Sequence, residues 1–250
     1  MLGRLGLLMI NQTSTIKILI LSLMLLVLPS CATVEPGQEP NPDPWEAWNR
    51  PVTSFNYALD RVILRPLAIS YRTVMPQFGE DAVSRIFGNV SEVNSLVNNL
   101  LQGQPKQAGN STGRFLVNST LGVGGIFDVA SLLGLEKQDP EDFGQTLGVW
   151  GVGPGPYFVI PFMGPSTLRD APSLAVDALL DPVNYIDEDV IRIPINGVDL
   201  IETRASLLEN ERLITGDIYI FIRDVYLQRR EFLIKDGELE DDSDDFLDDF

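Results

Sequence analysis

The side chains that most often do chemistry in proteins are scarce in this chain. Its 250 residues include no histidine and one cysteine, against 35 aspartate and glutamate residues. Without histidine the chain lacks the commonest general base, the commonest metal ligand and every Ser-His or Cys-His pair. The usual zinc sites are excluded as well. We therefore predict that the chain is not an enzyme and has no metal or cofactor; an acid dyad is the catalytic alternative that its carboxylates leave open.

The single cysteine, Cys31, stands where lipid attachment is expected. It follows the apolar run Ile18–Leu28, which is too short for a bilayer span and has Lys17 before it, as in a secretory signal peptide. The residues Leu28-Pro29-Ser30-Cys31 are similar to a bacterial lipobox, whose cysteine becomes the first residue and carries acyl chains. We predict a signal peptide over residues 1–30 and lipidation of Cys31. A buried, inert cysteine is the alternative.

The segments next to the body differ from it in composition. Residues 31–44 join the cysteine to a proline-rich and acidic stretch, which predicts an extended tether. Residues 236–250 carry nine acidic side chains and no basic one, so they predict a disordered tail; docking of its Phe and Leu side chains on a partner is the alternative to simple solvation. The formal net charge of −17 argues against nucleic acid as a partner, because phosphate contacts need clustered Lys and Arg.

Apolar residues at helical spacing predict a mainly α body over residues 45–235, without a convincing alternating strand. Asp43 suits a helix N-cap, Pro44 the first helical position and Glu46 a capping box, and Pro51 predicts a kink or break. The other predicted helices run from Pro66 to near Pro76, over Glu80–Leu101, from Pro105, through Val198–Leu208 and through Ile218–Phe232. The clearest amphipathic pattern is in Glu80–Leu101, whose apolar side holds Val83, Ile86, Phe87, Val90, Val93, Val97, Leu100 and Leu101.

Glycine is concentrated in the middle of the chain. More than half of the 21 glycines fall in Gly113–Gly164, among apolar and aromatic residues. Neither Leu121–Asp128 nor Gly148–Phe162 satisfies the dinucleotide-binding fingerprint, and neither is followed by a phosphate-loop lysine. Two interpretations remain open. The glycines permit tight turns and close packing, or they form a mobile hairpin beside an apolar path.

The order of motifs along the body resembles the VacJ/MlaA family of outer-membrane lipoproteins. The resemblance extends from Asp43 to about Phe232. It rests on Asp43–Arg50, Phe55–Tyr57, Arg65-Pro66, Asn99–Gly103, Leu121–Ala130, Phe143–Gly148, Gly151–Tyr157, Thr167–Asp170, Ile201–Ala205 and Tyr226–Arg229.

The resemblance implies a single ring-like helical domain with amphipathic helices embedded in the inner leaflet of the outer membrane and a Gly-rich hairpin. The ring would surround an amphipathic channel and contact a trimeric outer-membrane porin. Mislocalised phospholipids would pass through the channel from the outer leaflet to a soluble periplasmic carrier protein, which maintains lipid asymmetry without chemistry on the lipid. Ala32, in place of the aspartate that favours inner-membrane retention, fits an anchor on the periplasmic face of the outer membrane.

The resemblance also indicates three groups of candidate residues. The channel and hairpin group, which would gate lipid passage, is Gly151, Gly153, Gly155, Tyr157 and Phe158. The aromatic residues expected at the membrane interface or pore, or otherwise in the core, are Trp45, Trp48, Phe55 and Tyr57. The residues expected along a polar path, or otherwise in exposed ion pairs, are Arg169, Asp170, Glu202 and Arg204.

Two other functions remain open. A structural lipoprotein could scaffold porins or envelope partners without moving lipid, since it would share the anchor and the helices. A phospholipase would need an acid dyad or a serine, because histidine is absent. Movement of phospholipid by the protein distinguishes transport from a scaffold, and release of fatty acid would indicate the enzyme.

Overall fold

A computed structural model describes residues 43–237 of the chain. The predicted signal peptide, Cys31, nearly all of the tether and residues 238–250 lie outside the described residues. The first half of the described part contains α2 (Glu46–Leu59), the π-helix η1 (Asp60–Leu64), α3 (Arg65–Val74), α4 (Gln77–Leu101), α5 (Pro105–Thr120) and α6 (Val129–Leu132). The second half contains α7 (Phe143–Val149), β1 (Tyr157–Ile160), β2 (Gly164–Thr167), α8 (Asp170–Leu180), η2 (Pro182–Tyr185), α9 (Asp189–Ser206), η3 (Asn210–Leu213) and α10 (Ile218–Ile234).

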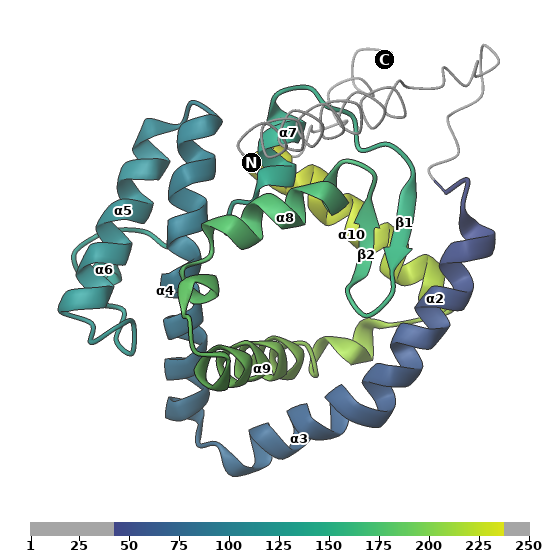
Figure 1. The fold of residues 1–250 in the computed structure, drawn as a ribbon, viewed down its shortest axis with the longest axis horizontal. Helices are drawn as coiled ribbons and strands as arrows, with labels where there is room; N and C mark the ends of the chain where they lie inside the picture. The colour runs from purple at the N-terminus through teal and green to yellow at the C-terminus, as the bar shows by residue number, and fades with distance from the viewer. Residues whose placement is uncertain (1–42, 238–250) are drawn as a thin grey trace, which may run out of the picture. The chain divides into compact units, whose positions relative to one another are not determined.

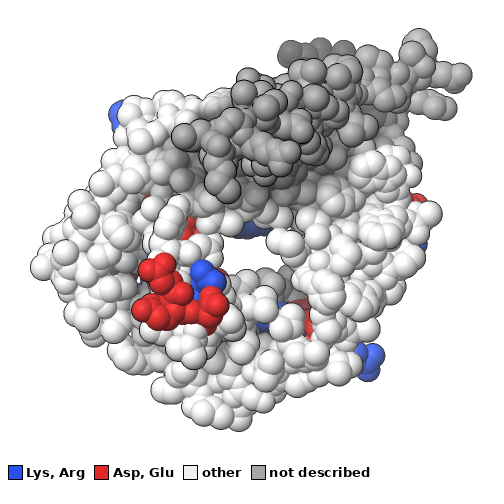
Figure 2. Space-filling model, viewed as in Figure 1, with Lys and Arg blue, Asp and Glu red and all other residues white. Residues whose placement is uncertain are grey.

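The prediction of a mainly α body is confirmed, and the helices of residues 43–237 follow one another around an open centre (Figure 1). Helices α4, α8 and α9 and the β-hairpin border this centre in the ribbon view, with α2 and α3 outside them, and the space-filling view shows the same face hollowed there (Figure 2). No helix within the described residues is both long and apolar enough to cross a membrane.

The segment Glu46–Val74 forms one continuous helical arm, so the predicted break at Pro51 is wrong. Pro51 removes one backbone donor, but Asn49, Val52 and Thr53 are buried on the packed face and hold the helix on both sides of it. The π-helical turn comes just before Pro66, whose ring would crowd the carbonyl four residues earlier in a regular α-helix.

Asp43 does not cap this arm, which corrects the predicted capping box. The cap position is Trp45, which makes no side-chain cap bond. Asp43 is buried and instead accepts a hydrogen bond from Asn49 Nδ2 at 2.7 Å and another from the Tyr219 hydroxyl of α10. The residue joins the start of the arm to the last helix because a buried carboxylate needs donors around it.

Helices α4 and α5 bury mostly polar side chains, and hydrogen bonds of Asn89 with Ser119 and of Arg114 with Glu92 join them. The residues buried on α4 are Asn89, Ser95, Asn98 and Asn99, and those on α5 are Ala108, Ser111, Arg114 and Asn118. Of the apolar side predicted for α4, Leu100 and Leu101 are exposed and the others are only half-buried. The helix was predicted at the right place, but its apolar side is not the side that the protein core covers.

The two strands form an antiparallel hairpin in which Tyr157 faces Thr167 and Ile160 faces Gly164. Its base belongs to a small core of Val52, Tyr157, Val159 and Tyr219, with Tyr226 and Leu227 packed against it. The core therefore joins α2, the hairpin and α10, which lie far apart in the sequence.

Candidate functional site

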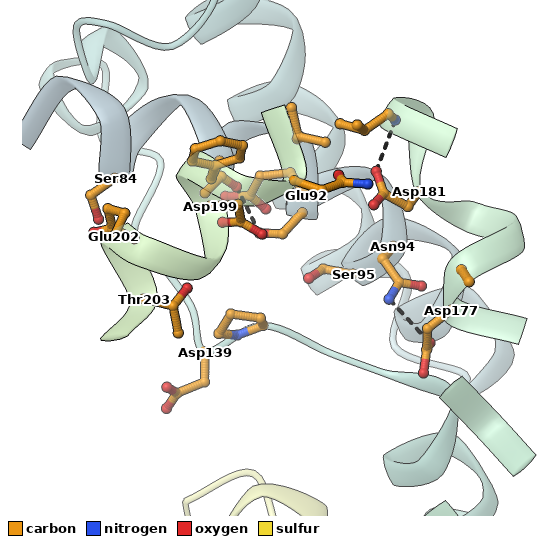
Figure 3. Close-up of a pocket in the computed structure, with 18 of the residues that line it drawn as sticks. Ser84, Glu92, Asn94, Ser95, Asp139, Asp177, Asp181, Asp199, Glu202 and Thr203 are labelled. Atoms are coloured by element: carbon orange, nitrogen blue, oxygen red, sulfur yellow. Dashed lines mark hydrogen bonds between the residues drawn. The ribbon is translucent and has the colours of Figure 1, made fainter. Parts of the chain in front are cut away.

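A cavity of about 630 Å³ lies between α4, α8, η2, α9 and the segment 137–140. This volume is within the usual range for a small-molecule site. Figure 3 shows carboxylates from several elements facing the same space. The acidic side chains that line it are Glu92, Asp139, Asp177, Asp181, Asp199 and Glu202, and the basic side chain is Lys137.

Some of these carboxylates are held by neighbouring groups. Asp177 accepts hydrogen bonds from Asn94 Nδ2 at 3.1 Å and from the Phe143 backbone N–H at 2.9 Å. Glu92 accepts from Nε of the buried Arg114 at 2.7 Å. These contacts fix the walls of the cavity, since both carboxylates join separate elements.

Two other carboxylates on the cavity wall have raised pKa values. Burial raises the pKa of Asp199, and the nearby charge of Asp181 raises it further. Burial also raises the pKa of Glu202, although a hydrogen bond from Ser84 opposes the shift. A cavity of this kind is wetted and receives cationic or hydrogen-bond-donating groups more readily than isolated anions.

Arg169 and Asp170 do not line this cavity. Both are buried, and Arg169 Nε donates to Asp170 Oδ1 at 2.7 Å. Arg230 of α10 donates to Asp170 at 3.1 Å and also binds Asp142, which caps α7. The pair thus belongs to a buried ion network that joins α7, α8 and α10, and neither the predicted polar path nor an exposed ion pair describes it.

Arg204 likewise joins separate elements of the fold. Its guanidinium binds both oxygens of Asp60, at 2.6 and 2.9 Å, and also Glu211, so it joins α9 to η1 and η3. Of the four residues predicted for a polar path, Glu202 lies on the cavity wall. The other three hold helices together around it.

The glycine group lies beside the hairpin rather than within it. Gly151, Gly153 and Gly155 fall in the loop between α7 and β1, whereas the hairpin turn is residues 161–163. Gly151 and Gly155 have φ of +86° and +66°, which favours glycine, and a Cβ at Gly155 would lie 3.0 Å from the Cβ of Leu168. Gly153 has neither constraint, since nothing lies within 4 Å of a Cβ built there.

Tyr157 is a core residue, which corrects its expected place in the channel and hairpin group. Its side chain is 1% exposed, and its hydroxyl has no hydrogen-bond partner among the described residues. Burial raises the pKa of the Tyr157 hydroxyl. Phe158, the next residue, points the other way and is half-buried against Trp45, with ring centres 5.9 Å apart.

The four aromatic residues of the α2 region are exposed, as a membrane interface would require. Trp48 is 56% exposed, and Trp45, Phe55 and Tyr57 are each more than 40% exposed. Trp48 Nε1 also donates to the Val159 carbonyl at 3.3 Å, which holds its ring near the hairpin. They are therefore not the core residues of the alternative interpretation.

Sequence reasoning missed two further features. The carboxylates of the cavity come from five separate segments, so no spacing pattern unites them. The stretch Gly109-Asn110-Ser111-Thr112-Gly113 matches the nucleophile-elbow pattern of hydrolases. Ser111, however, is buried within α5, whereas an elbow serine is exposed on a turn between a strand and a helix.

Comparison with known proteins identifies the family. The family model described as MlaA lipoprotein matches residues 41–233. The chain belongs to this family. The VacJ/MlaA resemblance found in the motifs is thereby confirmed.

Characterised MlaA relatives are similar over most of the chain. Proteins of Shigella flexneri and Escherichia coli K12, both named "Intermembrane phospholipid transport system lipoprotein MlaA", are 38% identical over 226 residues, which is 88% of this chain and 89% of theirs. The protein of the same name in Haemophilus influenzae is 32% identical over 212 residues, or 83% of this chain and 85% of its own. A solved structure from work on the "Structural basis for maintenance of bacterial outer membrane lipid asymmetry" has a TM-score of 0.69 and 38% identity, and covers 77% of this chain and 98% of its own.

Proposed function

We propose that this chain is a lipid-anchored lipoprotein on the periplasmic face of the outer membrane that removes mislocalised phospholipids from the outer leaflet. The lipid would pass through the polar centre of the helical body to a soluble periplasmic carrier. The names of the similar proteins, which refer to intermembrane phospholipid transport, support this proposal. The expected effect is maintenance of lipid asymmetry, without chemistry on the lipid.

The observation that carries the proposal is the inverted distribution of polar and apolar side chains. Among residues 43–237, apart from glycines, 17 buried residues are polar or charged and 8 are apolar. Large apolar side chains are meanwhile exposed on almost every helix, with Val62, Val74, Leu132 and Val190 more than 70% exposed. A water-soluble domain shows the opposite preference. Helices with apolar outer faces fit an interfacial position in one leaflet, where acyl chains cover them.

The cavity supplies the second requirement of lipid passage, a wetted route for the head group. Its wall contains Glu202 and five other carboxylates, next to apolar side chains such as Phe87 and Val90. We assign Glu202 to the polar path and the loop of Gly151, Gly153 and Gly155 to the gate. The loop is exposed and leads directly into β1 of the hairpin.

The proposed partners follow from the route of the lipid and from the family resemblance. A phospholipid that leaves the leaflet meets water, so its acyl chains need a soluble carrier with an apolar site. A trimeric porin is the proposed neighbour in the membrane. Lipidation of Cys31 would keep the body at the leaflet, since several acyl chains give stable anchoring where one gives only weak binding.

A clean deletion tests the proposed transport. Cells without the protein should accumulate phospholipid in the outer leaflet, measured by an impermeant reagent that labels exposed head groups. The wild-type gene should restore the low level, and a Cys31→Ala gene should not, because its product would lack the anchor. An outer leaflet unchanged by the deletion would favour the alternative function, a structural scaffold for porins or envelope partners.

A further inference from the structure

Two asparagine side chains of α2 bind the backbone of the hairpin, Asn49 within β1 and Asn56 at the turn. Asn49 Oδ1 accepts a hydrogen bond from the Val159 N–H at 2.8 Å, and its Nδ2 donates to the Tyr157 carbonyl at 3.1 Å. Asn56 repeats the arrangement at the turn: its Oδ1 accepts from the Phe162 N–H at 2.8 Å, and its Nδ2 donates to the Ile160 carbonyl at 3.0 Å. Each amide thus makes the pair of bonds that a neighbouring strand would make.

The two amides bind different parts of the hairpin. Asn49 binds Tyr157 and Val159 within β1, whereas Asn56 binds Ile160 at the end of β1 and Phe162 in the turn. Because Asn49 and Asn56 are seven residues apart, about 10.5 Å along an α-helix, α2 holds the hairpin at two separate points.

The two attachments differ in burial. Asn49 is 0% exposed, binds Asp43 as well, and holds Tyr157 and Val159, which are core residues. Asn56 is only half-buried, and its target Phe162 is 72% exposed. The hairpin is thus fixed at its base by a fully buried contact and attached at its turn by one that water reaches.

The turn also has an internal hydrogen bond and a ring contact with α2. The Met163 N–H donates to the Ile160 carbonyl at 3.2 Å, and Phe162 makes an edge-to-face contact with Phe55, with ring centres 5.2 Å apart. Phe162 has a φ of +68°, a strained value for a residue with a side chain, and Met163 beside it is exposed.

We propose that Asn56 is the positioning residue that holds the hairpin turn against α2, and that its amide is the contact released when the hairpin opens for lipid. Asn49 stays bound and acts as the hinge. The lipid part of this inference rests on the proposed function, whereas the attachment itself is independent of it.

Hydrogen exchange on the full-length protein in lipid vesicles tests the attachment. Asn56→Ala should raise the exchange rate of the Phe162 amide about tenfold, because the side-chain acceptor of this N–H is lost. The Val159 amide, held by Asn49, should exchange as in the wild type. Asn56→Asp keeps an acceptor for Phe162 and should give an intermediate rate. The matched control is Ser54→Ala, whose exposed hydroxyl bonds only the Arg50 carbonyl within α2.

Equal exchange of Phe162 in Asn56→Ala and Ser54→Ala would overturn the inference, as would equal acceleration at Phe162 and Val159, which would mean general loosening. The outer-leaflet phospholipid level of the same variants separates this inference from the proposed function. Suppose that Asn56→Ala shows faster exchange at Phe162 but the same outer-leaflet phospholipid level as Ser54→Ala. This result would support attachment of the turn by Asn56 and contradict a role of the hairpin in lipid passage.

Discussion

Individual carboxylates in this protein fall into two groups, those with an arginine partner and those without. Burial alone would raise the pKa of Asp142, but hydrogen bonds and charge from Arg230 hold it below its ordinary value, and Arg169 and Arg230 do the same for Asp170. Burial raises the pKa of Glu141 to about 7, since the hydrogen bond from Gln102 only partly compensates. The contributions of Asp142 and Asp170 to stability therefore change with pH in the opposite direction to that of Glu141.

Glu141→Gln should make the protein more stable above pH 7 and leave its stability almost unchanged at pH 4. The folded-state pKa of Glu141 lies above the ordinary value of 4.5, so the wild type loses stability as pH rises from about 4.5 to about 7. Thermal midpoints in detergent across this range measure the effect. Glu188→Gln, at an exposed position, is the control. A constant difference between Glu141→Gln and wild type at all pH values would contradict the expectation.

Arg230→Met should destabilise the protein by about 3 kcal/mol at neutral pH, because it leaves two buried carboxylates without their shared partner. The loss should shrink as pH falls through the depressed pKa values of Asp142 and Asp170, where protonation removes the charges. Denaturant unfolding measures both effects. Arg229→Met, on the same helix with a weaker exposed contact to Asp139, should cost far less. Similar losses in the two variants would refute the role of the network.

At the level of elements, local sequence signals predicted where the helices lie better than which of their faces are buried. Pro105 opens α5 as expected, whereas Pro66 lies within the continuous arm after the π-helical turn. The stop after Leu101 coincides with Gly103, whose φ is +78°. The burial of α4 could not be predicted, because its polar side meets α5 while apolar residues such as Leu100 face outward.

The hairpin contacts and the cavity also lay beyond sequence reasoning. Asn49 and Asn56 have no signature as strand partners, since their role depends on how α2 crosses β1. Asp43 was expected to cap a helix because caps are local, yet its partner Tyr219 is 176 residues away. The candidate residues that came from the family resemblance were placed only in part: Glu202 lines the cavity, whereas Arg169 and Arg204 hold elements together.

The loop before the hairpin should control lipid movement through its flexibility. Gly153→Pro restricts the loop and should impair removal of outer-leaflet phospholipid while protein level and membrane location stay normal. Gly153→Ala is the matched control, because φ at this position needs no glycine and nothing lies within 4 Å of the added Cβ. Head-group labelling of intact cells measures both variants. Normal lipid asymmetry in Gly153→Pro would instead favour a scaffold.

At the scale of the whole molecule, the helices of the described residues follow one another around an open centre (Figure 1). The side chains that they bury are mostly polar, and many large apolar side chains are exposed. This arrangement explains how the fold forms without a large apolar core: buried amides and ion pairs join the helices, and acyl chains would cover the outside. It also relates the two halves of the proposed function, since the same body offers an apolar surface to the leaflet and a carboxylate-lined cavity to a head group.

Crosslinking in native outer membranes tests whether lipid passes through the centre of the protein. A phospholipid with a photoreactive head group would be incorporated into cells, and labelled peptides of the protein identified by mass spectrometry. We expect labelling of the cavity wall, on α9 around Glu202 and on α4 around Asn94. This labelling should be lost in Gly153→Pro. Labelling confined to exposed apolar residues such as Val62 and Leu132, with none in the cavity, would contradict passage of lipid through the centre of the protein.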